Sequence, residues 1–163
     1  GYPLPVPEVT YEDDELVPYV PDISLPKAII VDIDGTVALK GTRSPFDETR
    51  VHEDLPNQPV IDAVEAMWRD GHQVIFCSGR TEATRLATAT WLRKHLPAVG
   101  VHAALFMRAV GDLRQDAVVK AEIFDRHIRD HYRVVAVFDD RDQVVAMWRR
   151  LGLVVFQVAY GDF

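Results

Sequence analysis

Two aspartates, Asp32 and Asp34, stand two positions apart directly after an apolar run, Ala28–Val31. A β-strand places residues i and i+2 on the same face, so both carboxylates are expected to point the same way as the chain leaves the strand. Gly35 follows and allows a sharp turn, because glycine tolerates positive φ. Paired acids at the end of a strand indicate a site for a hard metal ion and for phosphate chemistry.

Strands and helices that would position this pair alternate along the chain. Apolar segments predict buried strands at Ala28–Ile33, Gln73–Cys77, Ala104–Met107, Val134–Phe138 and Leu153–Val158. Apolar residues at helical spacing predict helices at about Pro59–Asp70, Thr81–His95, Asp116–Arg129 and Gln143–Leu151. Strands that alternate with helices are typical of an α/β domain with a mainly parallel sheet.

Polar residues follow four of the predicted strands. In parallel sheets, ligands bind beyond the carboxyl ends of the strands. The residues in question are Asp32 and Asp34 after the first strand, Ser78, Gly79 and Arg80 after the second, Arg108 after the third, and Asp139 and Asp140 after the fourth. Their shared placement at one edge of the sheet predicts a single site.

Attack by a carboxylate on a phosphate monoester brings negative charges together. At about 4 Å and an effective dielectric constant near 20, each pair of unit charges costs about 4 kcal/mol. A Mg²⁺ ion held by Asp32 and the Asp139/Asp140 pair would offset this repulsion, and Asp34 is a further candidate ligand. Lys120 and Arg80 would add positive charge.

Each acid of the first pair has a candidate role. Asp32 would attack phosphorus and form an aspartyl-phosphate. Asp34 would protonate the leaving oxygen and then take a proton from the hydrolytic water. Ser78 could donate its hydroxyl and its backbone N–H to phosphoryl oxygens, or it could serve only as the N-cap of the following helix.

The ordered motifs Asp-x-Asp-Gly-Thr, Ser-Gly-Arg, Lys120 and Asp139-Asp140 resemble those of the haloacid dehalogenase (HAD) superfamily. A closer resemblance, over about residues 27–163, is to the phosphatase domain of phage-type polynucleotide kinase/3′-phosphatases. The segments that carry it are Thr42–Asp47 (TRSPFD), Phe106–Lys120 (FMRAVGDLRQDAVVK), Phe138–Val145 (FDDRDQVV) and Gln157–Phe163 (QVAYGDF). This resemblance implies a Rossmann-like three-layer core.

The resemblance also implies an activity and further site residues. The activity is removal of a 3′-phosphate from a DNA or RNA end, with a kinase domain upstream in the full-length protein. Asp116 would orient Lys120, one helical turn away. The residues expected to bind substrate or phosphate are Thr36, Arg43, Gly79, Arg108, Asp116 and Arg141.

Little sequence remains for a cap over the site. The segment between the first two motifs, residues 37–77, is mostly loop and one helix, and Arg80–Lys120 holds one helix, one strand and a loop. A minimal cap would leave the site open to a polymer end, unless oligomerisation closed it.

Two alternatives to a polynucleotide phosphatase remain. The alternative within enzymes is a small-molecule or nucleotide phosphomonoesterase. A catalytically silent binding module in a repair assembly is a third hypothesis.

Composition sets the remaining expectations. A chain of 163 residues suits one domain, and the proline-rich, acidic residues 1–26 are expected to form a linker or an N-terminal arm. The net charge of −7 argues against broad electrostatic binding to nucleic acid. The single cysteine, Cys77, fits a reducing cytoplasm, of a bacterium or its phage, and no apolar run is long enough to span a membrane.

Overall fold

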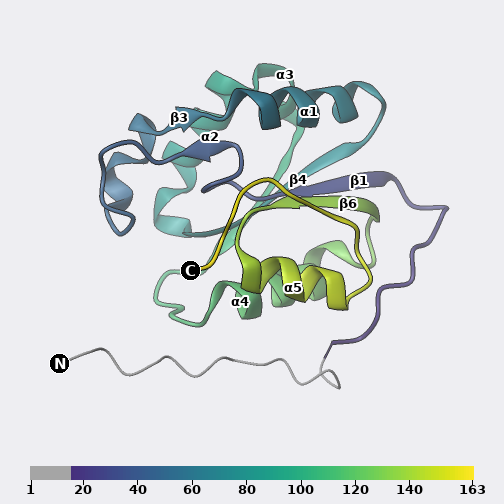
Figure 1. Ribbon diagram of the computed structural model, residues 1–163. Helices are drawn as coiled ribbons and strands as arrows, with labels where there is room; N and C mark the ends of the chain where they lie inside the picture. Colours follow the sequence, from purple (N-terminus) through teal and green to yellow (C-terminus); the bar gives the residue numbers. More distant parts are fainter. Residues whose placement is uncertain (1–15) are drawn as a thin grey trace.

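The computed structural model describes residues 16–163 (Figure 1). Within this range, five parallel strands form one sheet in the order β5-β4-β1-β6-β7. Their bounds are β1 Lys27–Val31, β4 Gln73–Thr81, β5 Ala104–Arg108, β6 Arg133–Asp139 and β7 Val155–Gln157. The five predicted strands and the mainly parallel sheet are therefore confirmed.

Strand β1 lies at the centre of the sheet. Its Ile30 pairs with Ile75 of β4 on one side and with Val137 of β6 on the other. The chain first builds the β4–β5 side and then crosses β1 to build the β6–β7 side. Ligands in such doubly wound sheets bind where the strand order reverses, so the carboxyl end of β1 is the expected place for a site.

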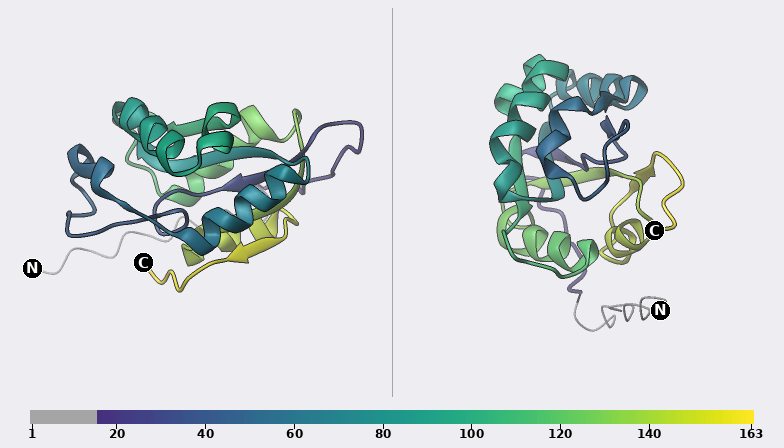
Figure 2. Two further views of the ribbon diagram at one scale, coloured as in Figure 1. Left: turned by 90° about the horizontal axis from the view of Figure 1, so that it is seen from above. Right: turned by 90° about the vertical axis from the view of Figure 1, so that its left-hand side faces the viewer.

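Helices cover both faces of the sheet, which confirms the three-layer architecture (Figures 1 and 2). Ile29 and Val31 face a core shared with α1 (Gln58–Arg69), α2 (Arg85–His95) and α3 (Pro97–His102). Ala28 and Ile30 face the opposite core, under α4 (Asp116–Ile123) and α5 (Asp142–Arg150). Both faces of β1 are buried, which explains why its sequence is an unbroken apolar run.

The helices differ from the predicted ones in three places, two at boundaries and one in helix type. The predicted helix at Thr81–His95 begins instead with the short helix η2 (Glu82–Thr84), because β4 continues through Thr81. Pro97, expected only to follow a helix, occupies the first turn of α3, where its fixed φ is compatible with a helix. Helix α4 continues into a π-helical turn, η3 (Phe124–Ile128).

The segment between β1 and α1 is small. It holds the short antiparallel pair of β2 (Ala38–Leu39) and β3 (Leu55–Pro56) and the 3₁₀ helix η1 (Glu48–Glu53). This is the minimal cap that was predicted, and within residues 16–163 no larger domain is inserted over the sheet edge.

Within residues 16–26, two side chains anchor the segment to the domain, while most of the others are exposed. Leu16 is buried in the core under α4 and α5. The Tyr19 hydroxyl donates to the carbonyl of Tyr132 at 2.9 Å and accepts from the amide of Val134 at 2.9 Å. The rest of the predicted arm, residues 1–15, lies outside the described residues. None of the helices in the described part of the chain is long and apolar enough to cross a membrane.

Candidate active site

A tight turn after β1 presents the first pair of acids. The Asp32 amide still donates to Phe138 of β6 at 2.9 Å, and the Ile33 carbonyl then accepts from three successive amides, at residues 36–38. Gly35 adopts a φ of +79°, and a Cβ there would overlap the carboxylate of Asp140. Glycine is thus needed both for the turn and for the close approach of the Asp140 side chain.

Asp32 is held through both carboxylate oxygens. Oδ1 accepts from Lys120 Nζ at 2.8 Å, and Oδ2 accepts from the Thr36 hydroxyl at 2.9 Å. Lys120 reaches Asp32 from α4 and also donates to Asp139 Oδ2 at 3.2 Å. All four side chains are buried. Thr36, expected to bind phosphate, contacts the candidate nucleophile in this structure.

Asp32, Asp139 and Asp140 form a group that fits a divalent cation. Their oxygens lie within 4.8 Å of one another, which among the described residues identifies them as a candidate metal site. Burial and the neighbouring Asp139 raise the pKa of Asp32 well above its usual value, despite Lys120. Burial likewise raises the pKa of Asp140. Hard oxygen donors that repel one another suit a small, highly charged cation.

Asp34 lies outside this group of acids, although it was counted among the candidate ligands. Its side chain is 49% exposed and pairs with arginines. Arg80 contacts it through Nη2 at 2.7 Å and Nε at 3.0 Å, and Arg43 approaches at 3.4 Å. The two carboxylates of the Asp-x-Asp motif thus have different surroundings: Asp32 faces a lysine and acids, and Asp34 faces arginines.

A residue that sequence reasoning missed, Asp54, holds both of these arginines. Its fully buried carboxylate accepts from Arg43 Nε at 2.6 Å and from Arg80 Nη2 at 2.7 Å. Trp91 of α2 donates from its indole to the Asp54 carbonyl at 2.9 Å. Asp54 lies between η1 and β3, in a stretch without hydrophobic periodicity, so no sequence signal marked it.

Asp116 contacts arginines rather than Lys120. Its carboxylate pairs with Arg108 and accepts from Arg141 Nη1 at 2.9 Å, whereas Lys120 is held by Asp32 and Asp139. The charges of Lys120, Arg141 and Arg108 lower the pKa of Asp116, although burial opposes them. Arg108 also donates to the carbonyl of Gly79 at 2.8 Å and to loop carbonyls at residues 112 and 114. Arg108 thus fixes the loop before α4.

Ser78 is not at a helix start. It lies inside β4, buried, and its hydroxyl accepts from the amide of Arg80 at 3.1 Å. The N-cap alternative is therefore wrong, because β4 stays paired with β5 as far as Thr81. In this arrangement the Ser78 hydroxyl helps to fix the backbone that carries Arg80.

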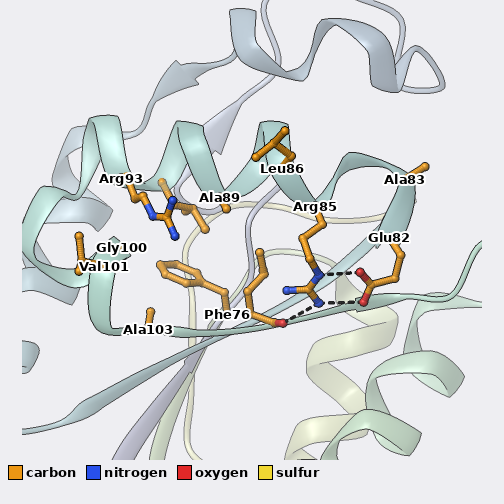
Figure 3. Close-up of a pocket in the computed structure, with 12 residues that line it drawn as sticks. Phe76, Glu82, Ala83, Arg85, Leu86, Ala89, Arg93, Gly100, Val101 and Ala103 are labelled. Atoms are coloured by element: carbon orange, nitrogen blue, oxygen red, sulfur yellow. Dashed lines mark hydrogen bonds and ion pairs between the residues drawn. The ribbon is translucent and has the colours of Figure 1, made fainter.

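A cavity of about 580 Å³ lies at the carboxyl edge of the sheet, and most of the predicted site residues line it: Asp32, Asp34, Arg43, Gly79, Asp116, Lys120, Asp139, Asp140 and Arg141. Thr36, Ser78, Arg80 and Arg108 stand behind this lining, as does Asp54. The cavity lining mixes carboxylates with cations, among them Lys40, Arg43, Lys120 and Arg141. A second hollow, of about 600 Å³, lies between α2, α3 and the edge strand β5 (Figure 3). It is mainly apolar, and its acid, Glu82, is already paired with Arg85. Of these two cavities, the first therefore has the carboxylates and cations that phosphate chemistry requires.

Comparison with known proteins agrees with this geometry. The family described as the phosphatase domain of polynucleotide kinase PNKP, of HAD type, matches residues 26–163. The chain belongs to this family. Its members are HAD phosphatases, and the match spans every residue of the site described above.

Individual relatives are larger than this chain. A protein of Autographa californica nuclear polyhedrosis virus, described as a bifunctional polynucleotide kinase/RNA ligase, is 38% identical over 145 residues, which cover 86% of this chain and 20% of the viral protein. A chain in the structure of the Pnkp1/Rnl/Hen1 RNA repair complex is 42% identical with a TM-score of 0.83, over 91% of this chain and 47% of that one. A class C acid phosphatase from Bacillus anthracis, 17% identical with a TM-score of 0.51 over 85% of this chain and 69% of its own, shares the fold.

Proposed function

We propose that this domain is a Mg²⁺-dependent polynucleotide 3′-phosphatase that works through an aspartyl-phosphate. The observation that carries the proposal is the placement of Asp32, a buried carboxylate fixed by Lys120 and Thr36 and open to the cavity. A nucleophile needs this kind of fixed position, because attack depends on the alignment of the reacting atoms.

The metal would be held by Asp32, Asp139 and Asp140. When bound, Mg²⁺ would supply positive charge to the phosphoryl oxygens and offset the repulsion between Asp32 and the substrate. Lys120 supplies a second positive charge beside the same carboxylate. The charges of Asp139 and Asp32 keep the pKa of Lys120 well above its usual value although burial opposes them, so the amine stays charged.

The remaining steps fall to Asp32 and Asp34. Asp32 attacks phosphorus and forms the aspartyl-phosphate as the bond to the 3′-oxygen breaks. Asp34 gives its proton to that oxygen and later takes one from the water that hydrolyses the intermediate. Arg80 and Arg43 orient Asp34, and Asp54 holds both arginines in turn.

The substrate class is supported by the family and by the open site. The family is that of polynucleotide kinase phosphatase domains, and the small β2–β3 segment leaves room for a polymer end. The chain spans less than half of each of the two longer relatives described above. We accordingly propose that it acts beside a kinase domain in nucleic-acid end repair.

A substrate panel tests the proposal. Phosphate release is measured with Mg²⁺ on 3′-phosphorylated DNA, 3′-phosphorylated RNA and nucleoside 3′-monophosphates. The expected result is much faster release from at least one oligonucleotide than from the mononucleotides. Equal or faster release from mononucleotides would favour the small-molecule phosphomonoesterase instead.

A matched pair of variants tests the mechanism. Asp32→Asn removes the proposed nucleophile, whereas Asp70→Asn alters an exposed carboxylate that pairs with Lys27 away from the cavity. Release should fall to the level of buffer alone for Asp32→Asn and stay at the wild-type rate for Asp70→Asn. Wild-type activity in Asp32→Asn would overturn the proposed nucleophile.

A further inference from the structure

The tail after β7 is fixed against the acids of the site. Gly161 is buried, and a Cβ there would overlap the backbone of Asp140 and Arg141. Its carbonyl accepts from the amide of Asp142 at 2.9 Å. Two residues later, the Phe163 carbonyl accepts from Arg141 Nε at 2.7 Å. The tail therefore has a defined position next to the proposed metal ligands (yellow in Figures 1 and 2).

This anchoring leaves Phe163 at the wall of the cavity. Phe163 lines the cavity together with Asp32 and Arg141, and 65% of this residue is exposed. The Arg141 guanidinium lies over one face, 5.0 Å from the ring centroid. Arg141 thus occupies one face of the ring, and Phe163 as a residue remains largely exposed.

The position of Arg141 does not depend on its contact with the Phe163 ring, so the ring is free to have another role. Arg141 is already fixed through polar contacts with the Asp116 carboxylate and the Phe163 carbonyl. The cavity of about 580 Å³ is of the size that holds a drug-sized ligand, so it has room for more than a phosphate group.

We propose that Phe163, which rests on Arg141, is the platform on which the base of the 3′-terminal nucleoside stacks while its phosphate lies at Asp32. The inference rests on the proposed function, because it names the part of the substrate that the site recognises. Base–aromatic stacking tolerates any base and contributes about 1–3 kcal/mol per base. Such a contact would favour nucleic-acid ends over simple phosphate esters without sequence preference.

The experiment compares Phe163→Ala with Phe163→Trp on three substrates. These are a 3′-phosphorylated oligonucleotide, the same oligonucleotide with an abasic terminal residue, and glycerol 2-phosphate, which has no aromatic group. Phe163→Ala should lower kcat/KM on the first substrate about 5- to 150-fold, mostly through KM, which corresponds to that range of stacking energy. Phe163→Trp should restore it. On the other two substrates, wild type and Phe163→Ala should be equal.

The test also needs a control variant and a statement of the results that would contradict the proposal. Tyr160→Ala removes a fully exposed aromatic ring from the same tail, outside the cavity lining, and should match wild type. Equal loss on all three substrates, or no loss on any, would overturn the stacking role while 3′-phosphatase activity stands. Absence of release from the oligonucleotide by wild type would instead overturn the proposed function.

Discussion

Arg80 and Asp54 stand 26 residues apart in the sequence, and their side chains meet at 2.7 Å in a buried contact. Arg80 belongs to β4, whereas Asp54 belongs to the small segment between β1 and α1. The contact ties that segment to the sheet edge at the point where Arg80 also holds Asp34. Asp54 is thus a positioning residue for the proposed general acid.

Asp54→Ala should destabilise the domain and impair catalysis. It would leave Arg43 and Arg80 buried without their shared partner, and breaking a buried ion pair costs about 3–5 kcal/mol. Urea denaturation measures the free energy of unfolding, and phosphate release measures activity. Asp70→Asn, at the exposed pair with Lys27, should cost at most about 1 kcal/mol. Equal losses in the two variants would contradict the role given to Asp54.

Mg²⁺ should stabilise the protein through Asp32, Asp139 and Asp140. At a concentration one hundred times its Kd, a ligand adds about 2.7 kcal/mol, or roughly 5–10 °C in Tm for a domain of this size. The shift should be strongly reduced in Asp140→Asn. It should persist in Asp112→Asn, whose carboxylate pairs with Arg114 outside the acid group. Thermal melts at constant ionic strength measure both, and an undiminished shift in Asp140→Asn would argue against the assigned ligands.

Trp148→Phe should raise the Mg²⁺ concentration that the enzyme needs for activity. The indole Nε1 of this buried residue donates to Asp139 Oδ2 at 3.2 Å, and phenylalanine keeps an aromatic ring but loses the donor. Loss of a hydrogen bond to a charged group costs about 1–3 kcal/mol. The Mg²⁺ concentration that gives half-maximal activity should rise. An unchanged Mg²⁺ requirement would mean that the indole does not position Asp139.

Cys77 should resist alkylation in the native protein. Burial raises the pKa of its thiol to about 12, so the reactive thiolate is scarce at neutral pH. The raised pKa also has a thermodynamic consequence. The contribution of this buried thiol to the free energy of unfolding is complete below its ordinary pKa of 9.0 and is lost as the pH rises through 12. Mass spectrometry after iodoacetamide treatment should show modification only in urea, and fast labelling without denaturant would disprove the burial.

The sequence carried enough information for the sheet and for the acids at its edge. Unbroken apolar runs predicted the buried parallel strands, and Asp32, Asp139 and Asp140 follow two such runs directly. Asp54 could not be predicted in the same way, because it lies in an irregular segment and acts only through arginines from elsewhere in the chain. Hydrophobic periodicity and short motifs do not show which distant residues a side chain such as Asp54 will contact.

Errors in the sequence prediction have similar causes. Asp116 and Lys120 do lie one helical turn apart and their charges interact, but the direct partners of both side chains come from elsewhere in the chain. Ser78 was expected at a helix start, because the preceding strand was predicted to end at Cys77. The structure keeps the strand going, since β5 supplies backbone partners beyond that point.

The central place of β1 has a consequence for synthesis of the protein. Val31 at the end of β1 pairs with Phe138 of β6, which leaves the ribosome only after most of the chain has been made. Until then, one edge of the strand that carries Asp32 lacks its neighbour. Such non-local pairing slows folding and exposes strand edges that favour aggregation. A chain that ends before β6 would also lack Asp139 and Asp140, two of the three proposed metal ligands.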